Sequence, residues 1–409
     1  MTLFFLMVFL FFVYVRPYEF IPFPFLLSFT RISILISLFF SFIENFRRNI
    51  VWKEKSFLYF TSLQILVLFL LPFSAWKANS FDFLVASYWK IFIAFYLLII
   101  VIDSYKRFNL IINTIFISCS IVALRILQAF YSNNYVFDGD GTRRVVGVAT
   151  LSSDNPNDLA LTLAMIIPLG IYLVYTKKGV VKKAIFFIFT ILGFFALMYT
   201  GSRGGYLGLI FGTLVFFIMK YKNQKGKLLA WFTGIMLTLL LLFPQEYKTR
   251  FLSSFNTSDY SYADERYGRI AIWKRSIQSI VAKPLGIGIN NCNLAEGEQK
   301  QEQGVSGRWN VTHNSYIQVG VELGIVGLLI YLLLLFSGLV NIGKVISLAK
   351  DAHDPNSVIC ACALAGSIAA FMVSSLFLSQ AYYWNHYIFI ALTVGLKNVL
   401  VNKSKDGSV

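Results

Sequence analysis

Residues 316–342 read YIQVGVELGIVGLLIYLLLLFSGLVNI and contain one charged side chain, Glu322. A helix that crosses a bilayer requires about 20 consecutive, mostly apolar residues. This stretch meets that requirement without the alternating pattern of a barrel strand. It therefore predicts a transmembrane helix.

Apolar blocks of the same kind recur along the chain, and together they predict about twelve spans. Backbone polar groups in lipid must be hydrogen-bonded internally, which helices achieve. We therefore predict an all-α, polytopic membrane helical bundle that forms a single domain over residues 1–409. The predicted spans are 2–15, 25–43, 56–73, 83–102, 108–130, 158–176, 184–200, 205–219, 228–243, 316–342, 357–377 and 386–401. The first is short, but it lacks the basic start and cleavage site of a signal peptide.

The composition agrees with this class, because 57% of the residues are hydrophobic and only 14% are charged. The net charge of +16 lies in short connectors between apolar blocks, so nucleic acid is not an expected partner. The four cysteines have neither metal-ligand spacing nor the pattern of a disulfide framework. We expect no metal and no cofactor.

The lysines and arginines follow every second span, which predicts that these connectors and both termini are cytoplasmic. The opposite connectors then face outward. The two substantial ones are residues 131–157 and 244–315, and we expect the second to be a large periplasmic loop with short helices between the ninth and tenth spans. The basic connector residues are Arg47, Arg48, Lys53, Lys55, Lys106, Arg107, Lys177, Lys178, Lys182, Lys183, Lys220, Lys222, Lys225, Lys227, Lys344, Lys350, Lys403 and Lys405.

A glycine-rich turn, Thr200-Gly201-Ser202-Arg203-Gly204-Gly205, opens the eighth span on the outward side. The free N–H groups of a helix start and the guanidinium of Arg203 would converge there and form an anion site. The structural alternative is a helix-hairpin turn whose arginine extends to the interface.

A second string, in the large loop, contains Arg266, Arg269 and Trp273, followed by Pro284-Leu285-Gly286-Ile287-Gly288. Arg269 and Trp273 would share one helix face, and the proline–glycine string would end that helix and bend the chain. A surface helix with a basic face is the alternative reading.

A third string, His313-Asn314-Ser315-Tyr316, leads into the tenth span. Asn314 or Ser315 could cap the helix, and Glu322 would lie at bilayer depth, where an ionisable residue suggests a functional site. His313 could accept a proton from a sugar hydroxyl or hold a phosphate. A structural, hydrogen-bonded histidine is the alternative.

A fourth string in the other outward connector begins with Arg143 and Arg144, a possible further anion contact. Asn155-Pro156-Asn157 follows and indicates first of all a turn and a helix cap. Residues 138–140, Asp-Gly-Asp, are interpreted as a turn and not as a metal site.

The order and spacing of these four strings resemble the O-antigen ligase and polymerase family of bacterial envelope glycan assembly. The resemblance extends from about Arg143 to Gly327, and the earlier part of the chain supports it only through its spans. The matching residues are Arg144 and Gly147 with Asn155-Pro156-Asn157, Ser202-Arg203-Gly204, Arg269 and Trp273 with Pro284-Leu285-Gly286 and Gly288, and His313-Asn314-Ser315-Tyr316 with Glu322-Leu323-Gly324.

The resemblance implies a metal-independent, inverting glycosyltransferase of the bacterial inner membrane with a periplasmic active site. Its donor would be a glycan on undecaprenyl diphosphate, and its acceptor the lipid A core, a growing glycan or a protein. Arg203 and Arg269 would bind the diphosphate, and His313 would sit at the acceptor hydroxyl. By its chemistry His313 is the expected base, and Glu322 is the weaker candidate, which would only orient the acceptor. The implied substrate-binding residues are Arg266, Arg144, Arg143, Asn314, Tyr316 and Trp273.

Two other classes stay open. A transporter, such as a flippase for lipid-linked oligosaccharides or a small-anion permease, would also have about twelve spans. It should line a path with mid-span polar groups, yet the mid-span charges are only Arg31, Lys90, Arg125 and Glu322. A non-catalytic scaffold would leave the arginine and histidine strings unexplained.

Overall fold

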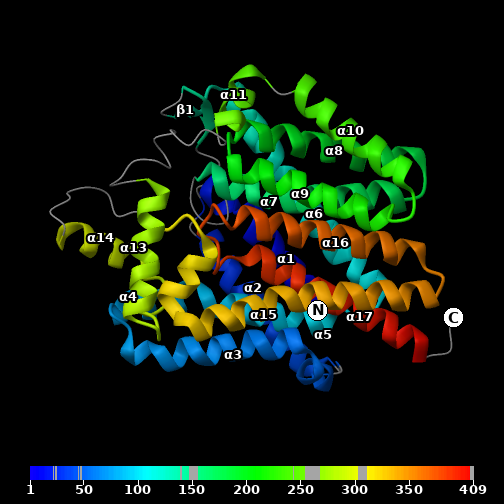
Figure 1. Ribbon diagram of the computed structural model, residues 1–409. Helices are drawn as coiled ribbons and strands as arrows, with labels where there is room; N and C mark the ends of the chain where they lie inside the picture. Colours follow the sequence, from blue (N-terminus) through cyan, green and yellow to red (C-terminus); the bar gives the residue numbers. More distant parts are fainter. Residues whose placement is uncertain are drawn as a thin grey trace.

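The computed structural model is a bundle of long helices whose axes are roughly aligned (Figure 1). It describes residues 1–21, 23, 25–44, 46, 48–138, 141–146, 155–242, 244–253, 268–302 and 311–405. Each of the twelve predicted spans falls on helical residues, apart from a residue or a few at some ends. The prediction of an all-α membrane bundle is confirmed.

The spans correspond to the long helices and to one composite element, in which α4, the π-helical turn η4 and α5 follow one another. The long elements are α1 (Thr2–Val15), α2 (Leu26–Ile43), α3 (Lys55–Leu70), α4 (Lys77–Phe83), η4 (Leu84–Tyr88), α5 (Trp89–Val101), α6 (Tyr105–Tyr131), α7 (Pro156–Thr176), α8 (Val180–Tyr199), α9 (Arg203–Lys220), α10 (Lys225–Leu242), α15 (Ser315–Asp351), α16 (Pro355–Ser374) and α17 (Trp384–Lys405). The shorter ones are η1 (Pro17–Glu19), η2 (Arg48–Lys53), η3 (Leu71–Phe73), α11 (Gln245–Ser253), α13 (Arg269–Ala282) and α14 (Cys292–Glu302).

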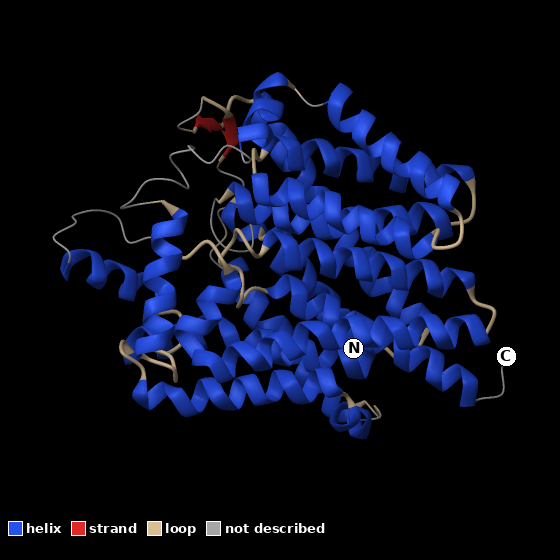
Figure 2. Ribbon diagram, in the orientation of Figure 1, coloured by secondary structure: helices blue, strands red, loops and turns tan. Residues whose placement is uncertain are grey.

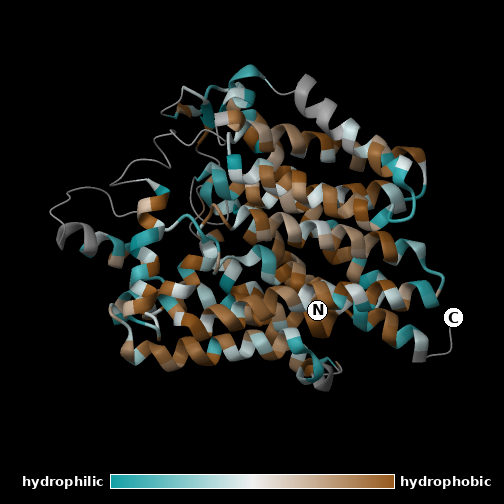
Figure 3. Ribbon diagram, in the orientation of Figure 1, coloured by the Kyte–Doolittle hydropathy of each residue, from teal (hydrophilic) through white to brown (hydrophobic). Residues whose placement is uncertain are grey.

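In the described part of the chain, eight helical segments are long and apolar enough to cross a membrane, and two more are shorter apolar helices. The shorter ones are Thr2–Val15 and Ser28–Ile43. Figure 3 shows the middle of the bundle as mostly hydrophobic and its two ends as more hydrophilic. The chain is therefore a multi-pass membrane protein.

The two ends of the bundle differ in what they carry. One end, here called the loop face, consists of residues 132–138, 141–146, 200–202, 268–302, 311–314 and 375–383 and lies at the left in Figure 1. The other, here called the lysine face, consists of residues 102–104, 177–179, 221–224 and 352–354. The described residues of the connectors predicted to be basic and cytoplasmic lie on the lysine face or beside it. That this face is cytoplasmic stays a prediction.

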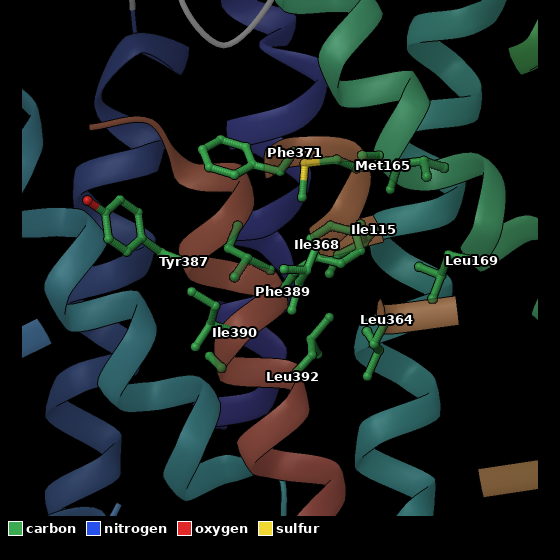
Figure 4. Close-up of a cluster of buried hydrophobic side chains, with 14 of the residues drawn as sticks. Ile115, Met165, Leu169, Leu364, Ile368, Phe371, Tyr387, Phe389, Ile390 and Leu392 are labelled. Atoms are coloured by element: carbon green, nitrogen blue, oxygen red, sulfur yellow. The ribbon is translucent and has the colours of Figure 1, made fainter. Parts of the chain in front are cut away.

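The core lies where α16 packs against α7, α9 and α15, with α17 alongside. Figure 4 shows Met165 and Leu169 from α7, Ile368 and Phe371 from α16, and Phe389 from α17 directed into one apolar cluster. These side chains are all buried or nearly so. The cluster holds the middle of the bundle together beneath the loop face.

The closest helix pair is α9 with α16, and small residues make this approach possible. A methyl group added to Gly212 would lie 2.7 Å from the carbonyl oxygen of Gly366, and one on Gly208 would overlap Ser374. Small residues let membrane helices approach until their backbones touch. This glycine seam fixes α9, which begins with Arg203, against the centre of the bundle.

A small hairpin on the loop face was not predicted. Strand β1 (Tyr135–Phe137) pairs antiparallel with β2 (Arg143–Val145), with Tyr135 opposite Val145 (Figure 2). The amide of Asp138 donates to the carbonyl of Thr142 at 3.0 Å, so the turn predicted at residues 138–140 is confirmed at Asp138. Residues 139 and 140 lie outside the described residues.

Candidate functional site

Arg203 is the first residue of α9, at the loop face, as predicted. Ser202 caps the helix, because its hydroxyl accepts a hydrogen bond from the amide of Gly205 at 3.3 Å. Gly201 has a φ of 62°, which a glycine adopts without strain. The turn therefore places Arg203 at the positive end of a helix dipole.

Two further arginines hold the backbone of this turn. Arg144 donates from Nε to the carbonyl of Thr200 at 3.0 Å, and Arg250 donates from Nε to the carbonyl of Gly201 at 2.6 Å. Both also form ion pairs with Asp138. Arg250 lies in α11 and was not singled out in the sequence, where no motif marks it.

The arginine pair of the fourth string is engaged within the protein. Arg144 donates to Asn157 Oδ1 at 2.7 Å, and its burial and the charge of Arg250 lower its pKa to about 10. Arg143 pairs with Glu246 at 2.7 Å, and this carboxylate raises the pKa of Arg143. Both arginines thus contribute to the folded loop face. Their predicted role in substrate binding stays a prediction.

The second string forms α13, which begins at Arg269. One turn along the helix, the indole Nε1 of Trp273 donates to the carbonyl of Thr312 at 2.8 Å. This bond fastens α13 to the residue that precedes His313. Arg266 lies outside the described residues.

His313 lies immediately before α15 with a φ of 49°, in the left-handed region that few residues other than glycine adopt. Its neighbours hold it there. Asn314 caps α15, as predicted, by accepting from the amides of Tyr316 and Ile317 at 2.9 and 3.0 Å. On the other side, the hydroxyl of Thr312 donates to the carbonyl of Asn314 at 3.1 Å.

The imidazole of His313 is partly buried and lies close enough to Arg269 to sense its charge. Burial and the nearby guanidinium lower the pKa of His313 to about 4. Both causes disfavour the imidazolium form. His313 is therefore neutral at pH 7 and can accept a proton.

The segment 375–383, between α16 and α17, connects the starts of α9 and α15. Toward α9, Ser374, the last residue of α16, donates to the carbonyl of Gly204 at 2.9 Å, and Phe377 of the segment packs against that glycine. Toward α15, the amide of Ser315 donates to the carbonyl of Ser375 at 2.8 Å. Gly204 directly follows Arg203, and Ser315 lies two residues after His313. The same short segment therefore contacts the neighbours of both site residues.

Residues 187–332 match the family described as O-antigen ligase. The match supports an assignment to the O-antigen ligase and polymerase family. No curated protein matches the sequence. The resemblance drawn from the four strings is thereby confirmed at the family level. The matched range contains Arg203, Arg269, His313 and Glu322, whereas Arg143 and Arg144 precede it. The family indicates glycosyl transfer in general, with lipid-linked glycan and acceptor partners.

The side chain of Glu322 is 1% exposed and contacts the turn that follows α13. Its two carboxylate oxygens accept from the amides of Asn290 and Cys292, each at 2.9 Å. Its backbone carbonyl accepts from the amide of Gly288 at 2.9 Å. Three hydrogen bonds to one turn make Glu322 a link between α15 and the end of α13.

The helix that contains Glu322 is interrupted at Gly324, whose φ is 69° and ψ −171°. At this break the helix backbone contacts the predicted Pro-Leu-Gly-x-Gly bend. The amide of Ile325 donates to the carbonyl of Pro284 at 3.1 Å. A side chain on Gly324 would overlap this carbonyl. The single predicted span 316–342 is therefore two helical pieces with the second string inserted at the break.

Three other side chains predicted to bind the substrate have hydrogen-bond partners within the fold. The hydroxyl of Tyr316 donates to the carbonyl of Met372 at 2.8 Å, and Trp273 and Asn314 make the bonds described above. The structure thus gathers Arg269, Trp273 and His313, and it connects Arg203 to them through segment 375–383.

Proposed function

We propose that this protein transfers a glycan from undecaprenyl diphosphate to an acceptor hydroxyl at the periplasmic loop face, with inversion at the anomeric carbon. The observation that carries the proposal is the pairing of a neutral, partly buried His313 with the guanidinium of Arg269. A base and a cation side by side suit a reaction that removes a proton from one substrate and places negative charge on another.

Arg269 and Arg203 would bind the diphosphate leaving group. Guanidinium groups form bidentate hydrogen bonds with phosphate oxygens and keep their charge at all relevant pH values. Arg203 adds the amides at the start of α9, where the helix dipole favours an anion. These groups would stabilise the charge that develops as the anomeric carbon–oxygen bond breaks.

His313 would accept the proton of the acceptor hydroxyl as that oxygen bonds to the anomeric carbon. Undecaprenyl diphosphate leaves from the opposite side with the bonding electrons, and the product glycosidic bond has inverted configuration. The free imidazole is a weak base because burial and the charge of Arg269 both disfavour its protonation. A diphosphate bound to Arg269 would offset this charge, so the donor itself would strengthen the base.

The lipid tail of the donor has a suitable place along α9. An apolar cavity of about 570 Å³ lies between α7, α8, α9 and α10. On α9 it begins at Leu209, about 9 Å along the helix from Arg203 at a rise of 1.5 Å per residue. A lipid whose diphosphate is held at Arg203 could therefore extend its polyprenyl chain into this cavity.

The test is transfer by the purified protein in detergent, given a glycan on undecaprenyl diphosphate and, separately, lipid A core, free glycan and protein acceptors. One added glycan per acceptor would identify a ligase, and a ladder of products would identify a polymerase. We expect transfer to continue in a strong chelator, because guanidinium and imidazole groups make up the proposed site. Donor that crosses vesicle membranes with no new glycosidic bond would support the transporter instead.

A further inference from the structure

A polar cavity of about 470 Å³ lies at the lysine face, at the opposite end of the bundle from the site described above. It is bounded by the start of α6, the end of α7, the connector from α15 to α16, and the end of α17. Its volume is in the range of pockets that hold small ligands. No step of the proposed transfer uses it.

Two lysines from different elements line this cavity, Lys177 after α7 and Lys403 in α17. Lys177 is oriented by a hydrogen bond from Nζ to Asn113 Oδ1 at 3.1 Å, and its burial lowers its pKa. A cation that is partly removed from water gains from an anion beside it. The positions of these lysines thus favour a negatively charged occupant.

Among the described residues of the lining, the one carboxylate is that of Asp354, and it is already engaged. Its oxygens accept from the hydroxyl of Tyr105 at 2.7 Å and from the hydroxyl and the amide of Ser357 at 2.8 and 3.2 Å. These bonds and the charge of Lys403 lower the pKa of Asp354. Asp354 therefore caps α16. Its hydrogen bonds and the charge of Lys403 offset part of its repulsion of an anion in the cavity.

Neutral donors complete the lining. Asn109 accepts from the hydroxyl of Tyr172 at 3.4 Å through Oδ1, and its amide nitrogen has no hydrogen-bond acceptor within the described residues. Asn356 at the rim likewise donates to no group in the described chain. Two lysines and two amide groups around one cavity match the several acceptor oxygens of a phosphate group.

We propose that this cavity binds a phosphate group, carried either by an anionic phospholipid head group or by a soluble phosphate compound. Basic pockets between transmembrane helices at the cytoplasmic side are suited to anionic head groups. Lys178 and Lys350 lie near this end of the bundle but do not line the cavity, so they provide the matched control. The proposal does not depend on the glycan-transfer activity.

The test measures binding by native mass spectrometry to the full-length protein in detergent. The probes are short-chain phosphatidylglycerol, short-chain phosphatidylcholine and inorganic phosphate. Lys177→Gln/Lys403→Gln removes both lining charges, and Lys178→Gln/Lys350→Gln removes two charges from the same face outside the lining. The melting temperature of each variant without ligand shows whether it folds, and the single substitutions replace any double variant that does not.

We expect phosphatidylglycerol to bind and to bind roughly thirty-fold more weakly to Lys177→Gln/Lys403→Gln, the loss for two cationic contacts. Lys178→Gln/Lys350→Gln should bind as the wild type does. If inorganic phosphate competes with phosphatidylglycerol and is weakened by the same substitutions, the natural ligand is a soluble phosphate compound. Equal binding of phosphatidylcholine, equal loss in both double variants, or no binding of any probe to the wild type would overturn the proposal.

Discussion

Arg203 and Arg269 reach the loop face from elements far apart in the chain, one from the start of α9 and the other from the start of α13. We predict that Arg203→Ala or Arg269→Ala lowers glycan transfer by about 10²–10³-fold, the usual effect of removing one stabilising donor from a transition state. Membrane insertion and melting temperature should stay near those of the wild type. Arg107→Ala, which removes an exposed ion pair near the lysine face, is the control and should transfer normally. Normal transfer by both loop-face variants would remove the diphosphate-binding role.

His313 is the residue that the proposal treats as the base. His313→Ala should lower turnover far more than the affinity for the lipid-linked donor, which can be measured separately by a binding assay. His313→Gln is the companion variant, since it keeps a hydrogen-bonding side chain without the basic nitrogen. A collapse of donor binding in both variants would instead make His313 a phosphate ligand.

The pH dependence of transfer tests the same residue. The active form is neutral His313, and its pKa in the free protein is lowered to about 4. The value of kcat/KM, which reports the free enzyme, should therefore persist as pH falls through 6.5 and decline only near pH 4. An acidic limb centred near 6.5 would show that Arg269 does not act on this imidazole.

At the residue level, the sequence indicated the side chains that lie within a recognisable motif. It missed those that reach the site only through contacts between distant parts of the chain. Arg203 and His313 stand beside glycine and helix-cap signals that can be read locally. Arg250 carries no such signal, and only the fold brings it to the carbonyl of Gly201. Segment 375–383 was hidden for the same reason, because its contacts join residues more than fifty positions apart.

Among the elements, the interrupted helix α15 gives Glu322 a structural task. Glu322→Ala would leave the amides of Asn290 and Cys292 without their acceptor, at a cost of about 1–3 kcal/mol for each buried donor. We expect the melting temperature and the transfer rate to fall together. Glu322→Gln keeps one acceptor oxygen, so its melting temperature and transfer rate should lie between those of the wild type and Glu322→Ala. Full stability with no transfer in Glu322→Gln would show that Glu322 carries a proton in the reaction.

Helix α9 gives a second prediction, on the lipid tail. Ile210 lines the apolar cavity, and the next residue, Phe211, is exposed and does not. Ile210→Trp should raise the KM for a donor with a full undecaprenyl chain and leave that for a short-chain donor unchanged. Phe211→Trp is the matched control and should change neither value. An equal effect on both donors in Ile210→Trp would place the tail elsewhere.

The sequence predicted the existence of the elements better than their interruptions. Each long apolar block became helix, because backbone groups in lipid have no other partners. The break at Gly324 was missed, since the apolar pattern continues through it unchanged. It forms because the amides of residues 287 and 288 donate to the carbonyls of residues 321 and 322, in place of the helical hydrogen bonds lost at the break.

For the whole molecule, the alternation of basic and non-basic connectors predicts which face is cytoplasmic. The native cysteines are all buried, so an introduced cysteine can be labelled selectively. We expect Ser132→Cys, on the loop face, to react with an impermeant maleimide in intact spheroplasts. Lys178→Cys, on the lysine face, should react only after permeabilisation. The reverse pattern would invert the topology and place the proposed site inside the cell.

The glycine seam between α9 and α16 has a consequence for how substrates enter. Where backbones touch, neither helix can slide or roll without losing contact along its whole length. We therefore expect Arg203 to keep its place throughout a catalytic cycle, as an immobile anchor. Room for a bulky sugar chain would then have to come from movement of α13, which begins with Arg269.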